Sequence, residues 1–291
     1  MKLSPIANGF GVAVSGVDLK SANLDSIAGE FERALDEHLL LVFRDADLDS
    51  EGYVRFGKAM GTLENFSRFD KIGGGYTIAI SNLGLDGSIV PPEDLMRRNM
   101  AADALWHTDH TYLPRRARYS FLKAEIVPEE GGGTDFCDTR AAYDALPEET
   151  KKRVDGLVGL HSILYSRELA GFTEWTDEQR AGLPPIPQPL IFQNPRTARK
   201  SLYIASHIGE IVGMPTAQAR RLVGELIDFT TQPLFVYSHK WRPNDIVVWD
   251  DRATMHRRAP YDDLNQVRKL HTMRVIEDSH LYDPEVTYVI H

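Results

Sequence analysis

Hydrophobic residues recur with helical spacing in two stretches near the start of the chain. Over residues 24–37 they fall on one face of a predicted helix, for which Asn23 is a plausible N-cap. A second helix is predicted over residues 50–60, with Gly61 as its stop. Between the two helices, the continuous apolar run over residues 39–43 has the length of a buried strand.

Short apolar runs, typical of strands, dominate the remainder of the chain. We expect strands over residues 76–82, 119–127, 134–138, 157–164, 201–206, 234–239, 245–250 and 269–276. Helices are expected over residues 140–146, in a further turn or two to 154, and over 216–230. Two polar stretches, residues 84–103 and 166–189, predict long loops, and we expect the first to lie over a pocket.

The order of these elements has no repeating βαβ rhythm, and no internal repeat or linker-like stretch divides the chain. Many short strands with helices attached outside are typical of an antiparallel sandwich or jelly roll. With 291 residues and 42% hydrophobic content, the chain is long enough to bury a full core. We therefore predict one mainly β domain over residues 1–291, in which residues 277–291 form a C-terminal tail.

The charge and composition of the chain narrow the classes of partner and the cellular location that we expect. The net charge of −9, with a pI near 5.6, disfavours a nucleic-acid binder. The single cysteine, Cys137, rules out an intrachain disulfide, and its strand-like surroundings predict packing rather than catalysis. No apolar run approaches a membrane span, and the start has no long apolar signal segment. We therefore expect a cytoplasmic protein without nucleic-acid or membrane partners, and a homo-oligomer.

The first candidate for chemistry is the segment of residues 106–110, which reads Trp-His-Thr-Asp-His. Residues two apart on a strand face the same side, so His107 and Asp109 would present an imidazole and a carboxylate to one metal ion. Alone this signal is weak, because about one such pair arises by chance in a chain of this composition. The alternative is an ordinary surface strand end. His110 should point away from the ligand face and is interpreted as structural.

The second candidate is His256, which follows the apolar strand of residues 246–248 and would face inward at the mouth of a barrel. Its alternative is a partly buried structural histidine. Two histidines and one carboxylate from distant segments form a facial group with three open coordination positions, as in non-heme Fe(II) oxygenases. Structural zinc would require four closed ligands, and the chain has no cysteine cluster. Four further histidines have no motif that supports them as metal ligands: His161, His207, His239 and His271.

The third candidate is a basic group on the last predicted strand, which contains Arg268, His271 and Arg274. Arg268, Thr272 and Arg274 alternate onto one face, together with Leu270. A guanidinium group there can pair through two hydrogen bonds with a carboxylate, such as that of an acidic cosubstrate. The alternative is a solvated strand face.

Taken together, these motifs resemble the TauD/TfdA family of Fe(II)- and 2-oxoglutarate-dependent dioxygenases, and most closely its TfdA-like aryloxyalkanoate enzymes. The similarity extends from Val17-Asp18-Leu19 to about Glu277. The matching segments are Leu41–Arg44, Phe56–Gly57, Gly61–Glu64, Ile80–Asn82, Trp106–Asp109, Gly132–Tyr143, Trp249–Asp250, His256–Arg257 and Arg268. Their order and spacing together carry the resemblance more than any single segment does.

The resemblance implies a fold, a set of ligands and a cosubstrate site. The fold would be a double-stranded β-helix, a cupin-like jelly-roll variant, with flanking helices. His107, Asp109 and His256 would ligate iron. Thr134 and Arg268 would hold 2-oxoglutarate, and Trp249 would pack close to it.

The resemblance also implies an activity on a small acidic substrate. An aryloxyalkanoate such as 2,4-dichlorophenoxyacetate would be hydroxylated beside its ether oxygen and would collapse to a phenol and an oxo-acid. O₂ and 2-oxoglutarate would be consumed, with release of succinate and CO₂. A sulfonate such as taurine, an amino acid or a natural-product acid is the alternative within the class. A non-catalytic jelly-roll binding protein is the alternative outside it.

The substrate side of the sequence departs from the TfdA pattern. Thr272 stands where that pattern has a second arginine, Ser88 where it has a lysine, and Asn194 where it has a histidine. Because a buried carboxylate needs a cation, we expect Arg274, on the same strand face, to bind the acid of the substrate. In the alternative, Arg274 pairs with a surface carboxylate such as Glu277 or Asp278. Other cations that can take this role are Lys71, Arg97 and Arg98.

Overall fold

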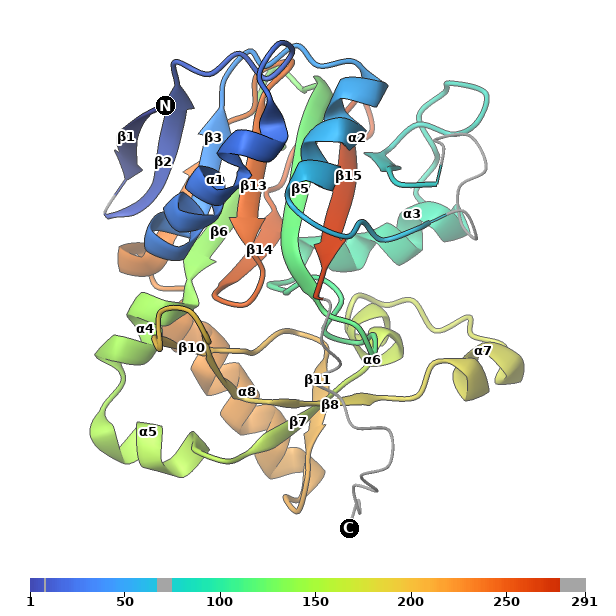
Figure 1. Ribbon diagram of the computed structural model, residues 1–291. Coiled ribbons are helices and arrows are strands. Elements are labelled where there is room, and N and C mark those ends of the chain that lie inside the picture. The colour runs from blue at the N-terminus through green and yellow to red at the C-terminus, as the bar shows by residue number, and fades with distance from the viewer. Residues whose placement is uncertain (8, 67–74, 278–291) are drawn as a thin grey trace.

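The largest sheet in the described residues has seven strands in the order β1-β2-β3-β13-β5-β15-β4 (Figure 1). The computed structural model describes residues 1–7, 9–66 and 75–277. The strands are β1 (Lys2–Ala7), β2 (Phe10–Ser15), β3 (Leu40–Phe43), β4 (Ile78–Ser81), β5 (Ala117–Ile126), β13 (Ile246–Asp250) and β15 (Lys269–Ile276). All neighbouring strands in this sheet are antiparallel except β2 and β3.

Three smaller sheets and a set of helices complete the described structure. The sheet that matters most for the site is β12-β6-β14, made of β6 (Thr134–Asp138), β12 (Val236–His239) and β14 (Thr254–Arg258). The others are β11-β7-β8 and β10-β9, made of β7 (Val158–His161), β8 (Ile186–Pro189), β9 (Ile191–Gln193), β10 (Lys200–Leu202) and β11 (Ile208–Ile211). The helices are α1 (Leu24–His38), α2 (Ser50–Ala59), α3 (Leu95–Met100), η1 (Ala101–Ala104), α4 (Thr139–Ala145), α5 (Glu148–Val154), α6 (Ile163–Leu169), α7 (Asp177–Gly182), α8 (Thr216–Thr230) and η2 (Pro233–Phe235).

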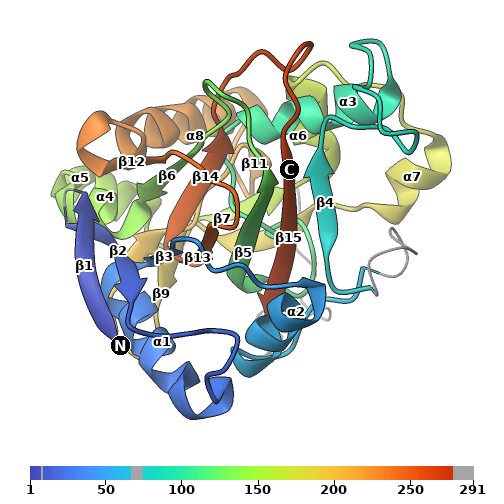
Figure 2. The ribbon, with the colours of Figure 1, turned by 90° about the horizontal axis from the view of Figure 1, so that it is seen from above.

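Helices α1 and α2 cover one face of the large sheet (Figure 2). The rings of Phe31 from α1, Phe56 from α2 and Phe43 from β3 meet one another edge to face, with centroids 5.3 to 5.5 Å apart. Such aromatic pairs add to the stabilisation from apolar burial alone. The helical faces predicted from the sequence therefore pack where the hydrophobic pattern requires.

The opposite face of the large sheet packs against the sheet β12-β6-β14. Because side chains alternate along a strand, Val42 and Val247 point away from α1 and α2 and join one cluster with Phe136 of β6. On the far side of the small sheet, Cys137 and Met255 pack against the apolar face of α8. Two facing sheets, antiparallel except for the β2–β3 pair, with helices outside confirm the predicted jelly roll, and Cys137 lies in packing contacts, as expected.

The two predicted loops contain regular structure that the sequence pattern did not reveal. Residues 84–103 include α3 and most of η1, and residues 166–189 include part of α6, all of α7 and β8. These loop predictions were therefore wrong. Helix α3 has no buried residue, and Leu95 on it is 57% exposed, so no apolar face marks it in the sequence. At the first helix, the side chain of Asn23 makes no capping hydrogen bond.

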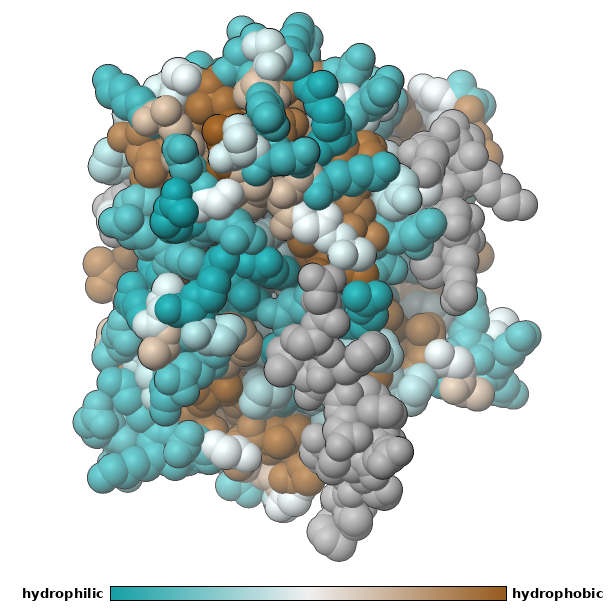
Figure 3. Space-filling model, viewed as in Figure 1, coloured by the Kyte–Doolittle hydropathy of each residue, from teal (hydrophilic) through white to brown (hydrophobic). Residues whose placement is uncertain are grey.

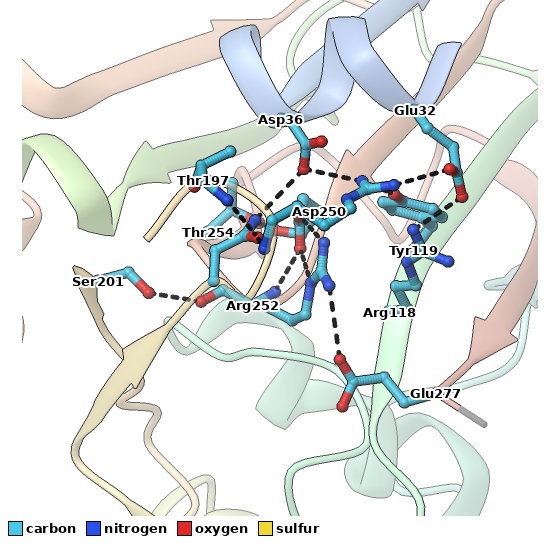
Figure 4. Close-up of polar contacts among 12 residues, drawn as sticks. Glu32, Asp36, Arg118, Tyr119, Thr197, Ser201, Asp250, Arg252, Thr254 and Glu277 are labelled. Carbon is cyan, nitrogen blue, oxygen red and sulfur yellow. Dashed lines mark hydrogen bonds and ion pairs between the residues drawn. The ribbon is translucent and has the colours of Figure 1, made fainter. Parts of the chain in front are cut away.

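The turn between β13 and β14 is held by a buried ion pair. The guanidinium of Arg252 donates from Nε to Asp250 Oδ1 at 2.8 Å and from Nη2 to Oδ2 at 2.6 Å. The backbone carbonyl oxygen of Arg252 accepts a hydrogen bond from Ser201 Oγ at 2.7 Å, and Arg252 Nη1 lies 3.6 Å from Glu277 Oε1 (Figure 4). These contacts tie the start of β14 to β10 and to the end of β15.

The face of the molecule seen in Figure 3 is mostly hydrophilic, with hydrophobic residues in small groups between the polar ones. In the described parts of the chain, no helix is both long and apolar enough to cross a membrane.

Replacing Arg252 with Ala leaves Asp250 as a buried carboxylate without its cation. The free energy of unfolding should fall by about 3–5 kcal/mol, as expected when one partner of a buried ion pair is removed. Urea denaturation followed by circular dichroism measures this loss. Arg153→Ala is the control, because Arg153 and Glu225 form an exposed pair worth at most about 1 kcal/mol. Equal effects of the two substitutions would contradict the account of the turn.

Candidate metal centre and cosubstrate pocket

Two backbone hydrogen bonds bring His107 and His256 side by side. The amide of His107 donates to the carbonyl of His256 at 3.0 Å, and the amide of His256 donates back at 2.8 Å. The centroids of the two imidazole rings are 4.2 Å apart. His107 makes only this isolated bridge, and the chain turns directly after Thr108. The expected strand alternation is therefore not what places Asp109 beside His107, although the two side chains do meet.

The three predicted ligands form one compact group. One candidate ligand atom from each of His107, Asp109 and His256 lies within 4.8 Å of the others. The Nδ1 of His107 lies 2.7 Å from the carbonyl oxygen of Leu105, which leaves Nε2 for a metal ion. No other group of three or more metal-binding side chains is present in the described residues. Two imidazoles and one carboxylate are the donor set of non-heme Fe(II) sites, so these residues fit iron.

Asp109 is held by two further side chains that the sequence reasoning did not connect to it. Ser120 Oγ on β5 donates to Asp109 Oδ2 at 2.8 Å. Arg274 Nη2 on β15 donates to Oδ1 at 3.0 Å, and Arg274 Nε lies 2.9 Å from Oδ2. Both partners are far from Asp109 in sequence, and no local motif links them to it.

The protonation states of the group suit metal binding at neutral pH. Burial alone would raise the pKa of Asp109, but the charge and the hydrogen bond of Arg274 outweigh it and hold that pKa well below its usual value. Burial lowers the pKa of His256 to about 3. Asp109 is therefore a carboxylate and His256 a neutral imidazole, which are the forms that ligate metals.

The group opens into a cavity of about 500 Å³ between the two facing sheets. Seven residues proposed from the sequence line it: His107, Asp109, Thr134, Trp249, His256, Arg268 and Arg274. Lys71, also proposed, lies outside the described residues. Thr272 also lines the cavity, whereas Ser88 and Asn194 do not and bond instead to Asp86 and Asp36. The structure thus brings together residues that are far apart in the sequence.

Arg268 is a buried cation with neutral partners. Its Nε donates to the carbonyl oxygen of Gly132 at 2.7 Å, and its Nη2 donates to Thr134 Oγ1 at 3.3 Å. Among the described residues, no carboxylate pairs with it. Burial, followed by the charge of Arg258, lowers the pKa of Arg268 to about 9. Because an unpaired buried charge is costly, this guanidinium fits an anionic ligand in the cavity.

Gly132 permits this arrangement through its backbone. Its φ is +62°, in the left-handed region, and a Cβ there would lie 2.5 Å from Cγ of Pro128. Any side chain would therefore displace the carbonyl that receives Arg268. Gly132, in the run of three glycines over residues 131–133, thus has a role in positioning the arginine.

The cavity also contains residues that the sequence did not single out. His207, which no motif supports as a ligand, lines the cavity, and its ring centroid lies 6.0 Å from that of His107. Arg167 lines the same cavity and pairs with Asp103 at 3.2 Å. Helix α3, inside a predicted loop, contributes Met96 and Met100. Only the expectation that residues 84–103 lie over a pocket anticipated any of these contributions.

The alternative in which Arg274 pairs with Glu277 was wrong. Glu277 Oε2 accepts instead from Arg116 Nη2 at 3.1 Å, and its other oxygen faces Arg252. Asp278, the other surface carboxylate considered, lies outside the described residues. His110 is buried with its ring beside that of Phe66, and it is not among the three grouped ligands, as predicted.

Comparison with known proteins agrees with the class that this fold and site define, the non-heme iron oxygenases that use a 2-oxo acid. The family model described as "Taurine catabolism dioxygenase TauD, TfdA family" matches residues 2–275. The chain therefore belongs to the TauD/TfdA family and is a 2-oxoglutarate-dependent dioxygenase. The cofactor and cosubstrates of this class are Fe(II), 2-oxoglutarate and O₂.

Individual relatives are similar over almost their whole length. An alpha-ketoglutarate-dependent 2,4-dichlorophenoxyacetate dioxygenase of Cupriavidus pinatubonensis is 36% identical, covering 95% of this chain and 98% of the relative. An (S)-phenoxypropionate/alpha-ketoglutarate-dioxygenase of Sphingobium herbicidovorans is 38% identical, covering 95% of each. The crystal structure of AAD-2 in complex with Mn(II) and N-oxalylglycine has a TM-score of 0.90 at 38% identity, covering 96% of this chain and 99% of that one.

Removing any one of the three grouped ligands should abolish metal binding. His107→Ala, Asp109→Ala and His256→Ala each leave two protein ligands, while the hydrophobic contacts that hold the fold stay intact. Titration with Mn(II) or Fe(II) under anaerobic conditions measures the stoichiometry, and circular dichroism checks the fold. His271→Ala is the matched control, because His271 lies elsewhere on β15 beside Glu125. Metal binding at full stoichiometry in any ligand variant would overturn the group.

Proposed function

We propose that this dioxygenase hydroxylates an aryloxyalkanoate such as 2,4-dichlorophenoxyacetate and cleaves its ether. The observation that carries the proposal is the composition of one cavity. It combines three candidate iron ligands, a buried arginine that has no acidic partner among the described residues, and a largely apolar wall. The names of the similar proteins, which act on 2,4-dichlorophenoxyacetate and (S)-phenoxypropionate, support the same substrate class.

In this proposal, the cosubstrate lies between the metal ligands and Arg268. Arg268 and Thr134 hold the distal carboxylate of 2-oxoglutarate, and the planar guanidinium matches it through two hydrogen bonds. Trp249 is fully buried with its ring 4.8 Å from that of His256, so it closes the wall of the site beside the metal. His107, Asp109 and His256 hold the iron.

The substrate ring is proposed to lie against the apolar wall of the cavity. This wall comes from β4, α3 and β5, and its members are Ile78, Ile80, Met96, Met100 and Leu122. A mainly apolar pocket with a few polar groups is the usual form of a site for a small aromatic molecule. The side chains of methionine adapt to ligands of irregular shape. A chlorinated phenyl ring fits these surroundings better than a fully polar substrate does.

The residues of the chain position the reactants and exclude water. When bound, Fe(II), 2-oxoglutarate and O₂ supply the oxidising chemistry, with conversion of 2-oxoglutarate to succinate and CO₂. Arg268 and Thr134 fix one end of the cosubstrate, and the apolar wall holds the substrate ring. Arg274 orients Asp109 and faces the cavity. Hydroxylation of the carbon beside the ether oxygen then gives a hemiacetal, which collapses to a phenol and an oxo-acid.

A screen of substrates tests this proposal directly. With Fe(II) and 2-oxoglutarate, we expect 2,4-dichlorophenoxyacetate or 2-phenoxypropionate to release succinate and a phenol in equal amounts. Taurine, amino acids and the matching phenols serve as comparison substrates. Succinate release that depends on taurine or another non-ether acid, with none from any aryloxyacid, would contradict the substrate class and favour the alternative acids.

We further propose that Arg274 binds the acid of the substrate. Arg274 reaches the cavity beside Thr272, and its Nε and Nη2 face Asp109. Among the described residues, no hydrogen bond or ion pair engages its Nη1. One guanidinium can therefore hold the metal ligand on one side and offer a donor to a carboxylate on the other.

Arg274→Gln should raise the KM of the acidic substrate by about tenfold or more, because a desolvated carboxylate loses its charged partner. The KM for 2-oxoglutarate should barely change. Metal titration of the same variant distinguishes the contact of Arg274 with Asp109 from its proposed contact with the acid of the substrate. An unchanged substrate KM together with weakened metal binding would mean that Arg274 serves Asp109 alone, and attention would move to Lys71, Arg97 and Arg98. Of these, Arg97 pairs with Asp263 and Arg98 with Glu174.

Two further proposals concern the cellular location and the oligomeric state of the protein. A cytoplasmic location is supported by its single cysteine, Cys137, which is buried and free. The proposed homo-oligomer is tested by light scattering coupled to size-exclusion chromatography, and the location by fractionation of the source cells.

A further inference from the structure

Arg258 faces the same cavity as the metal ligand His256. The two residues are two positions apart on β14, so their side chains point to the same side of the sheet. Both line the cavity of about 500 Å³. Arg257, between them, points to the other side, where its Nε donates to Asp135 Oδ2 at 3.0 Å and its guanidinium covers the ring of Trp106. The strand thus directs one arginine inward and its neighbour outward.

The position of Arg258 matches the cosubstrate end of the cavity. In the register of β14 and β6, Arg258 lies opposite Thr134, whose Oγ1 accepts from Arg268 Nη2 at 3.3 Å. Two strand residues span about 7 Å, which is comparable with an extended five-carbon diacid. A molecule chelated at the metal beside His256 would therefore carry its far end to Arg258 and Arg268.

Arg258 and Arg268 form a pair of cations for which the described residues supply no acidic partner. Across the described chain, the contact found for Arg258 is with the ring of Tyr261, 5.6 Å from the guanidinium carbon. After burial, the charge of Arg258 is the next cause of the lowered pKa of Arg268, so the two guanidinium groups influence each other. Both also line an adjoining side cavity of about 210 Å³. Two like charges facing one space favour an anion between them.

We propose that Arg258 is a further cosubstrate-binding residue, which contacts the distal carboxylate of 2-oxoglutarate together with Arg268. The inference rests on the cosubstrate site given under the proposed function and adds a second cation to it. Arg274 of β15 lies six residues beyond Arg268, which directly precedes that strand. Six residues of extended chain span about 20 Å, and Arg274 lies at the Asp109 end of the cavity. Arg258 therefore serves the cosubstrate end, and Arg274 serves the end proposed for the acid of the substrate.

Calorimetric titration of the Mn(II)-loaded protein, without substrate, tests this role. Two ligands are compared: 2-oxoglutarate and 2-oxovalerate, which has the same chain length without the distal carboxylate. Arg258→Gln should weaken 2-oxoglutarate binding by about tenfold, and 2-oxovalerate should bind the variant and the unaltered protein equally. Arg257→Gln is the matched control and should bind both ligands as the unaltered protein does. Arg258→Lys, which keeps the charge, should recover part of the affinity.

Unaltered 2-oxoglutarate affinity in Arg258→Gln would overturn the proposal. Equal weakening of both oxo acids would also overturn it, since the distal carboxylate would then not be what Arg258 recognises. If Arg258→Gln fails to fold by circular dichroism, Arg258→Met and Arg258→Lys carry the same comparison. A negative result in the aryloxyalkanoate screen leaves these titrations unaffected, whereas failure of the unaltered protein to bind 2-oxoglutarate would count against the cosubstrate site itself.

Discussion

The pair of backbone hydrogen bonds between His107 and His256 is the contact on which the site depends. Strand β14 lies in the small sheet, with Met255 packed toward α8 and His256 directed between the sheets. The segment after η1 joins β14 through this bridge and through Thr108, whose Oγ1 donates to the carbonyl oxygen of Thr254 at 3.0 Å. The chain then turns to bring in Asp109. A shift of one residue in the register of β14 would direct Met255 into the cavity and His256 toward α8, because strand side chains alternate.

The charges of the cavity are divided between its two ends. At the metal end, Arg274 pairs with Asp109, so the carboxylate is oriented and stays ionised. At the other end, Arg268 and Arg258 have no carboxylate partner in the described parts of the chain, which leaves a net positive charge. A 2-oxo diacid has complementary chemistry, with a chelating end for the metal and an anionic end for the arginines. The protein has a net charge of −9, so this positive site is a local feature of the cavity.

The sequence predicted the chemistry of the site better than its geometry. The residue types of His107, Asp109 and His256 predicted a ligand group, and the structure brings the three side chains together, although residues 107–109 do not form the expected strand. The alternation of Arg268, Thr272 and Arg274 was read correctly, since all three line the cavity. The pairing of Arg274 with Asp109 was missed, because contacts between residues 165 positions apart leave no local pattern.

The elements that were missed lack a strong hydrophobic period. Helix α3 has no buried residue, and β1 and β2 precede the first helix without having been predicted. Arg258 was overlooked because a charged residue after a predicted ligand is usually a solvated one. The division into one domain over residues 1–291 stays a prediction, and most of the proposed tail, residues 278–291, lies outside the described residues.

We expect one cavity of the protein to hold Fe(II) and chelating 2-oxoglutarate together. Anaerobic addition of 2-oxoglutarate to the Fe(II)-loaded protein, followed by visible absorption, tests it most directly. Chelation of Fe(II) by a 2-oxo acid produces a charge-transfer band, which we expect to saturate at one equivalent of each component. Binding of both without such a band, or a band of full intensity after His256→Ala, would contradict the account.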